Sequence, residues 1–257
     1  MTPADLVRVL DRHLRTETFP LGILRLDPGA EPPERAKRPL RDMGTRIAIC
    51  QGISIARRYG WTVAMGAEDM ACPVARAVFG FEEPVEYYTE GNLAAGMYAR
   101  DLPAGRRMEE ALERCAPGEL EGIAVGPLER IDREPETVLV YGNSAQVLRL
   151  VNAALWEEGG SLPSDFSGRA DCSDIVLKAA RTGRPQVILP CYGDRVFGMT
   201  ADHEMAFTFP FSWAARIAEG LEQTHRAGVR YPIPQFLRFE PSFPPSYRKL
   251  ESIWRSG

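Results

Sequence analysis

Hydrophobic residues recur along the chain with two different spacings, which predicts a fold that mixes helices and strands. Apolar positions three or four residues apart predict amphipathic helices over 3–14, 42–59, 145–158 and 211–227. Short apolar runs bounded by turn-forming residues predict strands over 21–26, 61–65, 122–128, 137–141, 186–189 and 204–209. Shorter helices are expected over 72–79, 92–100, 107–115 and 173–181. The pattern therefore predicts an α/β or α+β fold with a mostly buried sheet.

A pattern of elements repeats at an offset of 100 residues. Gly60 is followed by twelve residues, of which the last is Cys72. Gly160 is likewise followed by twelve residues, of which the last is Cys172. Each segment follows a predicted helix. We therefore expect a single two-lobed domain over 1–240 with two similar strand-helix-strand halves, about 20–120 and 121–210, followed by a proline-rich tail over 241–257.

Composition and charge narrow the class of protein. Charged residues make up 26% of the 257 residues and hydrophobic residues 44%, which is typical of a globular chain. A net charge of -4 argues against a nucleic-acid-binding surface. No apolar run approaches the ~20 residues needed to cross a bilayer, and residues 1–17 lack the apolar core of a secretory signal. We therefore expect a cytoplasmic protein with no nucleic-acid or membrane partner, whose five cysteines stay reduced.

Four of the five cysteines lie beside polar turns or on an inward helix face, and they are Cys50, Cys72, Cys172 and Cys191. Four thiolates form the complete ligand set of an iron–sulfur cluster or a structural zinc ion. Their spacing matches neither a ferredoxin nor a zinc-ribbon pattern. Two alternatives stay open: the cysteines can pack as small buried residues, or one can act as a redox or catalytic thiol. No histidine stands near enough in sequence to be an obvious activating partner.

Two glycine-containing polar turns carry the candidate anion-binding residues, which are Ser167, Gly168, Arg169, Gly193, Asp194 and Arg195. Exposed backbone amides and guanidinium groups at such turns bind carboxylate or phosphate. The alternative is that Arg169 and Arg195 pair with Asp171, Asp194 or Glu204 and hold the loops in place. No Walker or dinucleotide-binding fingerprint is present.

Seven segments together resemble a known family. They are Cys50-Gln51, AEDMACPVA around Cys72, VYGNSAQVLRLVNAAL, FSGRADC, LPCYGDRVFG, EMAF and HRAGVRYPIP, spread from about Leu21 to Leu237. The chain resembles the bacterial and archaeal proteins grouped as domain of unknown function 169. The resemblance implies a cytoplasmic prokaryotic protein, and because many such proteins come from anaerobes it favours an iron–sulfur cluster.

Two functional hypotheses follow from these residues. In the first, an inter-lobe site binds an iron–sulfur cluster through the four cysteines and has a redox or ligand-binding role with a redox partner. Arg169 and Arg195 would then hold a small anionic ligand or tune the charge of the cluster. In the alternative, the protein is a metal-free small-anion-binding protein or enzyme, and the cysteines are structural.

Overall fold

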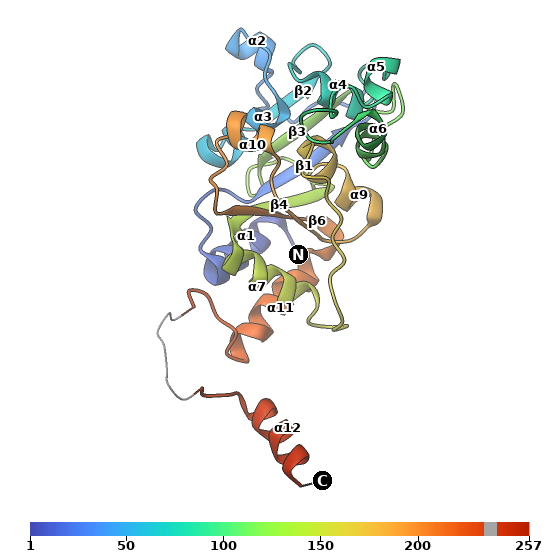
Figure 1. The fold of residues 1–257 in the computed structure, drawn as a ribbon. Helices are drawn as coiled ribbons and strands as arrows, with labels where there is room; N and C mark the ends of the chain where they lie inside the picture. The colour runs from blue at the N-terminus through green and yellow to red at the C-terminus, as the bar shows by residue number, and fades with distance from the viewer. Residues whose placement is uncertain (234–240, 257) are drawn as a thin grey trace.

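A six-stranded antiparallel sheet forms the centre of the computed structural model, which describes residues 1–233 and 241–256 (Figure 1). The strands follow the order β2-β3-β1-β4-β6-β5, and every neighbouring pair runs antiparallel. Their bounds are β1 Leu21–Leu26, β2 Val63–Gly66, β3 Gly122–Pro127, β4 Thr137–Asn143, β5 Gln186–Ile188 and β6 Glu204–Pro210. All six predicted strands are confirmed, and because no pair is parallel the fold is α+β.

Three long helices cover one face of the sheet: α1 (Pro3–Leu14), α7 (Ser144–Ala154) and α11 (Ala214–Arg226) (Figure 1). A short 3-10 helix, η1 (Phe211–Trp213), leads from β6 into α11. The buried side chains of this layer meet alternate residues of β4 and β6, and the cluster includes Leu6, Leu10, Val138, Val140, Leu150, Phe207, Phe209, Ile217 and Leu221. This layer is a continuous aliphatic and aromatic core.

The opposite face is covered mainly by α3 (Ile49–Tyr59) and the short helices α4 (Pro73–Val78), α8 (Asp171–Asp174) and α9 (Lys178–Thr182). Its buried cluster includes Leu21, Ile23, Ile49, Ile53, Met65, Ile123, Ile175 and Ile188. Helix α10 (Tyr192–Phe197) packs on α3, and α2 (Pro39–Met43), α5 (Glu86–Thr89) and α6 (Leu102–Glu110) complete this side. In this layer the helices are short and the loops between them are long, so side chains of the loops also face inward. The cysteines lie in this layer.

Local sequence signals explain where the main helices begin and end. The Asn143 side chain accepts hydrogen bonds from the backbone N–H groups of Ala145 and Gln146, both at 3.0 Å, which caps α7. Gly60 ends α3 with a φ of +73°, a left-handed conformation in which glycine has no Cβ to clash.

The two similar halves are not confirmed. Helix α3 packs in the core of one sheet face and α7 in the core of the other, so the two segments of the repeat pattern have different surroundings. The strands of both supposed halves belong to one sheet, and the molecule is a single domain rather than two symmetric lobes. A twelve-residue spacing counts positions along the chain and carries no information about which face a helix covers.

Several of the shorter helix predictions were wrong. Residues 92–100 form turns, the helix expected over 107–115 is α6 and lies earlier, and the helix expected over 173–181 is broken into α8 and α9. Helix α10 was not expected, and the segment 241–256 contains the helix α12 (Pro245–Arg255). The expected domain limit at residue 240 lies outside the described residues. Across the parts of the chain that the structure describes, no helix is long and apolar enough to span a membrane.

Candidate functional site

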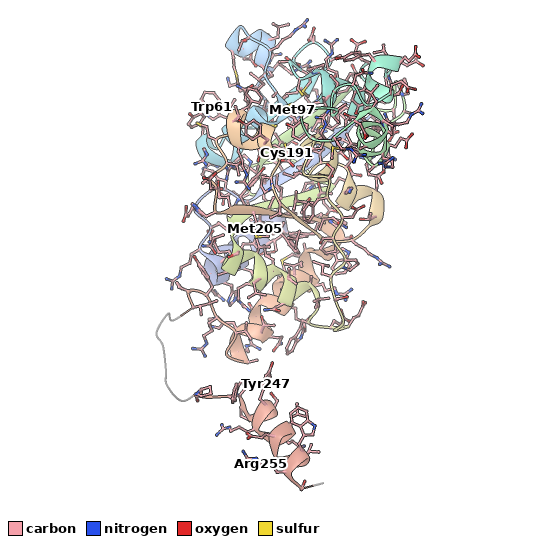
Figure 2. The ribbon with its side chains drawn as sticks, viewed as in Figure 1. Trp61, Met97, Cys191, Met205, Tyr247 and Arg255 are labelled. Carbon is pink, nitrogen blue, oxygen red and sulfur yellow. The ribbon has the colours of Figure 1, made fainter. Side chains whose placement is uncertain are left out.

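Cys50, Cys72, Cys172 and Cys191 line one cavity of about 380 Å³ on the α3 side of the sheet. Figure 2 labels Cys191, which directly precedes α10. The other lining residues are Ala48, Ile49, Gln51, Ala71, Pro73, Val74, Tyr98, Arg169, Ala170, Asp171, Gly193 and Phe197. The structure therefore brings together all four cysteines that the sequence singled out, although they come from four separate segments.

Cys50 and Cys72 are held near each other by backbone hydrogen bonds between the loops that precede their helices. Cys50 is the second residue of α3, and Cys72 is the residue that caps α4. The N–H of Ile47 donates to the carbonyl of Asp69 at 3.0 Å, and the N–H of Ala71 donates to the carbonyl of Ile47 at 2.8 Å. These bonds fix the relative position of the two cysteine-bearing loops.

Cys172 and Cys191 form a second pair, which a buried carboxylate connects. Cys172 lies in α8, and Cys191 caps α10. The backbone N–H of Cys191 donates to both carboxylate oxygens of Asp171, at 3.0 and 3.2 Å. Because Asp171 directly precedes Cys172, this bond joins the two cysteine-bearing segments at the cavity wall.

Burial and mutual proximity raise the pKa of three of the thiols. Burial, followed by the neighbouring Cys72, Cys191 and Asp171, raises the pKa of Cys172 well above its ordinary value. Burial and the Asp171 carboxylate raise the pKa of Cys191 to about 12. Burial, together with Asp194 and Cys191, also raises the pKa of Cys50. These sulfurs are therefore neutral thiols when no cation is bound, and they are close enough to affect each other's charge.

The four cysteine side chains line a cavity but do not converge on a single position that could hold one metal ion. In the described part of the chain, no three side chains of His, Cys, Asp or Glu converge in a way that could hold a metal ion. The cysteines line the cavity together with apolar side chains such as Ile49, Val74 and Phe197.

Arg169 is the one predicted anion-binding arginine that lines the cavity. Its guanidinium donates to the carboxylate of Glu109 at 2.6 Å, and it lies 5.0 Å from the centre of the Tyr98 ring. Both partners of this ion pair are buried. The partner of Arg169 is thus a residue of α6 that the sequence did not indicate.

The remaining predicted anion-binding residues have other structural roles, except for Gly193, which lines the cavity. Arg195 donates to the backbone carbonyl of Ala201 at 2.7 Å, which secures the loop before β6. Ser167 donates to the carboxylate of Asp174 at 2.8 Å, and Gly168 adopts a φ of +64° in the same turn. The structure therefore separates the two arginines that the sequence grouped together.

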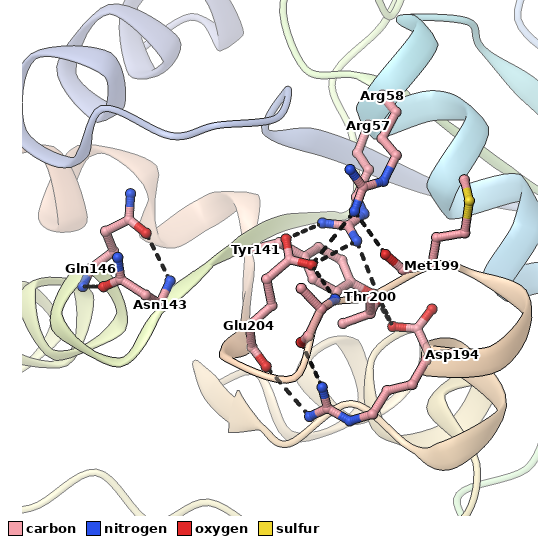
Figure 3. Close-up of polar contacts among 11 residues, drawn as sticks. Arg57, Arg58, Tyr141, Asn143, Gln146, Asp194, Met199, Thr200 and Glu204 are labelled. Atoms are coloured by element: carbon pink, nitrogen blue, oxygen red, sulfur yellow. Dashed lines mark hydrogen bonds and ion pairs between the residues drawn. The ribbon is translucent and has the colours of Figure 1, made fainter.

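A buried polar network, which sequence reasoning missed, connects α3, α10 and the start of β6 (Figure 3). Arg57 donates to the carboxylate of Glu204 at 2.5 and 3.1 Å and to the hydroxyl of Thr200 at 3.1 Å. Thr200 and Tyr141 donate in turn to the carboxylate of Asp194, at 2.7 and 2.9 Å. Because Asp194 lies three residues after Cys191, the network holds α10 and its cysteine against α3.

One signal in the sequence could have revealed this network. Arg57 falls on the apolar side of α3, in step with Ile49, Ile53 and Ala56, and a charge in that position needs a buried partner. The partner itself, Glu204, lies 147 residues away, so its identity depends on the pairing of strands.

Comparison with known proteins gives one family and one relative. The sequence model of domain of unknown function 169, described as "Uncharacterised ArCR", matches residues 9–220, a range that includes all four cavity cysteines. The uncharacterised protein MJ0308 of Methanocaldococcus jannaschii is 26% identical over 176 residues, which are 67% of this chain and 75% of that protein. No solved structure matches the chain.

Proposed function

This chain belongs to the family of domain of unknown function 169, and we propose that its cysteine cavity binds an iron–sulfur cluster with a redox role. The observation that supports the proposal is that Cys50, Cys72, Cys172 and Cys191 line one cavity. Four cysteine thiolates are the usual complete ligand set of such a cluster. Four scattered cysteines that only packed as small apolar residues would have no reason to share one wall.

The arrangement of the thiols favours a cluster over a single zinc ion. A zinc ion requires its four sulfurs to converge on one point at about 2.3 Å from the metal. No such convergence exists among the described residues, and the cavity of about 380 Å³ provides room for several atoms between the thiols. A [4Fe–4S] cluster places each cysteine on a separate iron, so its ligands stand farther apart than those of one zinc ion.

The surroundings of the thiols are suited to a redox centre. Apolar side chains, including Ile49, Val74 and Phe197, line the cavity, and water access and nearby charge both tune the potential of a cluster. Arg169 and Asp171 both line the wall, and burial together with the nearby Asp194 raises the pKa of the Asp171 carboxyl well above its ordinary value. Binding of iron would release the thiol protons, so cluster assembly is expected to be favoured by higher pH.

The test is anaerobic reconstitution of the full chain with iron and sulfide. We expect bound iron and sulfide in constant proportion and the visible absorption of a cluster. The Cys72→Ser and Cys191→Ser variants should lose most of the iron. Cys115→Ser is the matched control because Cys115 is also buried but does not line the cavity. Colourless, iron-free protein after reconstitution would reject the proposal.

A small anion bound in the metal-free cavity is the second candidate function, and the position of Arg169 is the observation that favours it. Glu109 already neutralises this guanidinium, so the anion would have to compete with a buried carboxylate. Equilibrium dialysis of iron-free protein with phosphate and with a dicarboxylate, using wild type and Arg169→Gln, tests this function. Saturable binding that the variant loses would support it.

A further inference from the structure

Helix α12 is an amphipathic helix whose apolar face is uncovered. It comprises the eleven residues Pro245–Arg255 and has no buried side chain. Pro245 occupies its first turn, where a missing N–H costs nothing, and Arg255 pairs with Glu251 one turn earlier. The helix lies beyond residues 9–220, the part that matches the family. It has its own local helix signals.

One side of α12 carries a continuous apolar stripe. Tyr247, Leu250 and Ile253 follow one another at spacings of three residues, Trp254 lies four residues after Leu250, and the four side chains are 63%, 46%, 56% and 73% exposed in chain order. The ring of Phe243 stacks on the ring of Tyr247, with 6.1 Å between their centres, and extends the stripe toward the chain preceding the helix. Figure 2 labels Tyr247 and Arg255, which mark the two ends of α12.

A free helix of this kind needs a surface to bind. The other helices of comparable amphipathicity, α1, α3 and α11, bury their apolar faces in the core of the domain. An isolated helix of fewer than about 12 residues is only marginally stable in water. The apolar face of α12 is therefore stabilising only when a membrane or another molecule removes it from water.

The charge of α12 indicates what kind of surface this is. The helix carries Arg248, Lys249 and Arg255 against the single Glu251, which gives it a net charge of 3 - 1 = +2, whereas the whole chain carries -4. At 100° per residue, Lys249 lies beside Ile253 at one edge of the stripe. Glu251 lies at the other edge, beside Tyr247, and Arg248 and Arg255 lie just beyond it. Basic residues that flank an apolar stripe can reach phosphate groups while the stripe is buried.

We propose that α12 lies in the surface of an anionic lipid bilayer, with the stripe from Tyr247 to Trp254 turned toward the acyl chains. A strongly amphipathic, basic helix with aromatic residues on its apolar face is the usual form of an interfacial helix. The aromatic rings of Tyr247 and Trp254 combine an apolar body with a polar group, which suits the boundary between headgroups and acyl chains. Because one short helix binds weakly, the attachment is reversible.

This attachment differs from the membrane partner that the sequence pattern argued against. That argument concerned a run of ~20 apolar residues that crosses a bilayer. A helix that lies parallel to the surface needs only one apolar side, and α12 has one. The attachment does not depend on whether the cavity binds a cluster, since α12 contributes no residue to the cavity.

The test is flotation of the full chain with vesicles of phosphatidylcholine alone and with vesicles that also contain phosphatidylglycerol. We expect binding only to the anionic vesicles and a loss of binding at high salt. Leu250→Gln, on the stripe, should weaken binding at least tenfold. Ser252→Gln, on the polar side, is the matched control and should bind as wild type. Arg255→Gln should weaken binding about fivefold, because each basic residue near the surface contributes about that factor.

Two results would overturn the proposal. The first is that wild type does not bind the anionic vesicles, or that Leu250→Gln binds them as well as Ser252→Gln does. The second is a concentration-dependent dimer, seen by light scattering and abolished by Leu250→Gln, together with no vesicle binding. That result would assign the stripe to a second copy of the chain. Circular dichroism of every variant checks that the domain is folded, and it should be, because α12 buries no side chain.

Discussion

The guanidinium of Arg57 and the carboxylate of Glu204 form a buried, two-point ion pair that joins α3 to the first residue of β6, with N–O distances of 2.5 and 3.1 Å. The Tyr141 ring lies 4.0 Å from the same guanidinium. Both Arg57 and Tyr141 are fully enclosed by the domain. The pair therefore connects the main helix of the cysteine side to the centre of the sheet.

Removal of one partner of this ion pair should destabilise the domain strongly. Arg57→Met leaves the Glu204 carboxylate buried without its cation, and we expect the free energy of unfolding to fall by about 3 to 5 kcal/mol. Urea unfolding followed by circular dichroism measures the loss. Arg58→Met is the matched control: Arg58 approaches the same carboxylate at 3.6 Å but is partly exposed, so its loss should cost less than about 1 kcal/mol. Equal losses in the two variants would contradict the assignment.

The buried thiols should react slowly in metal-free protein. Burial and Asp171 raise the pKa of Cys191 to about 12 from an ordinary value of 9.0, which lowers its thiolate fraction about a thousandfold near neutral pH. We therefore expect iodoacetamide at pH 8 to leave Cys191 and Cys172 largely unmodified in the folded protein and to modify both after unfolding. Mass spectrometry of the peptides measures each site. Rapid labelling of Cys191 in the native state would disagree with the buried geometry.

A pair of histidines between α1 and α11 should make stability depend on pH. Burial, His225 and Arg149 lower the pKa of His13, whose ring centre lies 4.9 Å from that of His225. Among the described residues, neither ring nitrogen of His13 has a hydrogen-bond partner. Because the unfolded chain binds a proton more tightly at this site, the contribution of neutral His13 is present above about pH 6.5 and is lost as the pH falls below it.

The pH experiment compares urea unfolding of wild type and His13→Leu between pH 5 and 7.5. Stability of wild type should fall with decreasing pH by up to about 1.4 kcal/mol per pH unit more than stability of the variant. His203→Leu, which changes an exposed histidine, should keep the wild-type slope. An unchanged slope in His13→Leu would mean that other groups cause the pH dependence.

The contact between α7 and α11 should not tolerate even one added methyl group. A Cβ built on Gly220 would lie 2.2 Å from the carbonyl oxygen of Ala153 and 2.6 Å from its Cα, and both are backbone atoms that cannot turn aside. Gly220→Ala should therefore cost about 1 to 3 kcal/mol, in spite of the better helix propensity of alanine. Glu219→Ala, on the exposed side of the same helix, should be nearly neutral. Thermal unfolding of both variants distinguishes the two outcomes.

The strands and long helices could be predicted from the sequence because their signals are local. Short apolar runs identified every strand, and Asn143 and Gly60 are local signals at the ends of their helices. The order of strands in the sheet could not be predicted, since β1 lies between β3 and β4 and these pairings join distant segments. The prediction of two similar halves also depended on such distant pairings, and it is not confirmed.

The candidate site was predicted in part. Polar turns, and for Cys50 an inward helix face, led to the hypothesis that Cys50, Cys72, Cys172 and Cys191 share one site, and all four line one cavity. The same kind of turn signal grouped Arg169 with Arg195, but their partners come from other parts of the fold. Arg169 lines the cavity and donates to the carboxylate of Glu109, whereas Arg195 donates to the backbone carbonyl of Ala201 and does not line the cavity. A turn motif indicates that a side chain is free to form a polar contact, but it does not indicate which residue of the fold will be its partner.

The layer of α1, α7 and α11 contributes no residue to the cysteine cavity, because the full thickness of the sheet separates them. Substitutions in these three helices can therefore raise or lower the melting temperature without changing a residue that lines the cysteine cavity. Substitutions in this layer can therefore tune the stability of the domain independently of the cavity, because the sheet lies between the two.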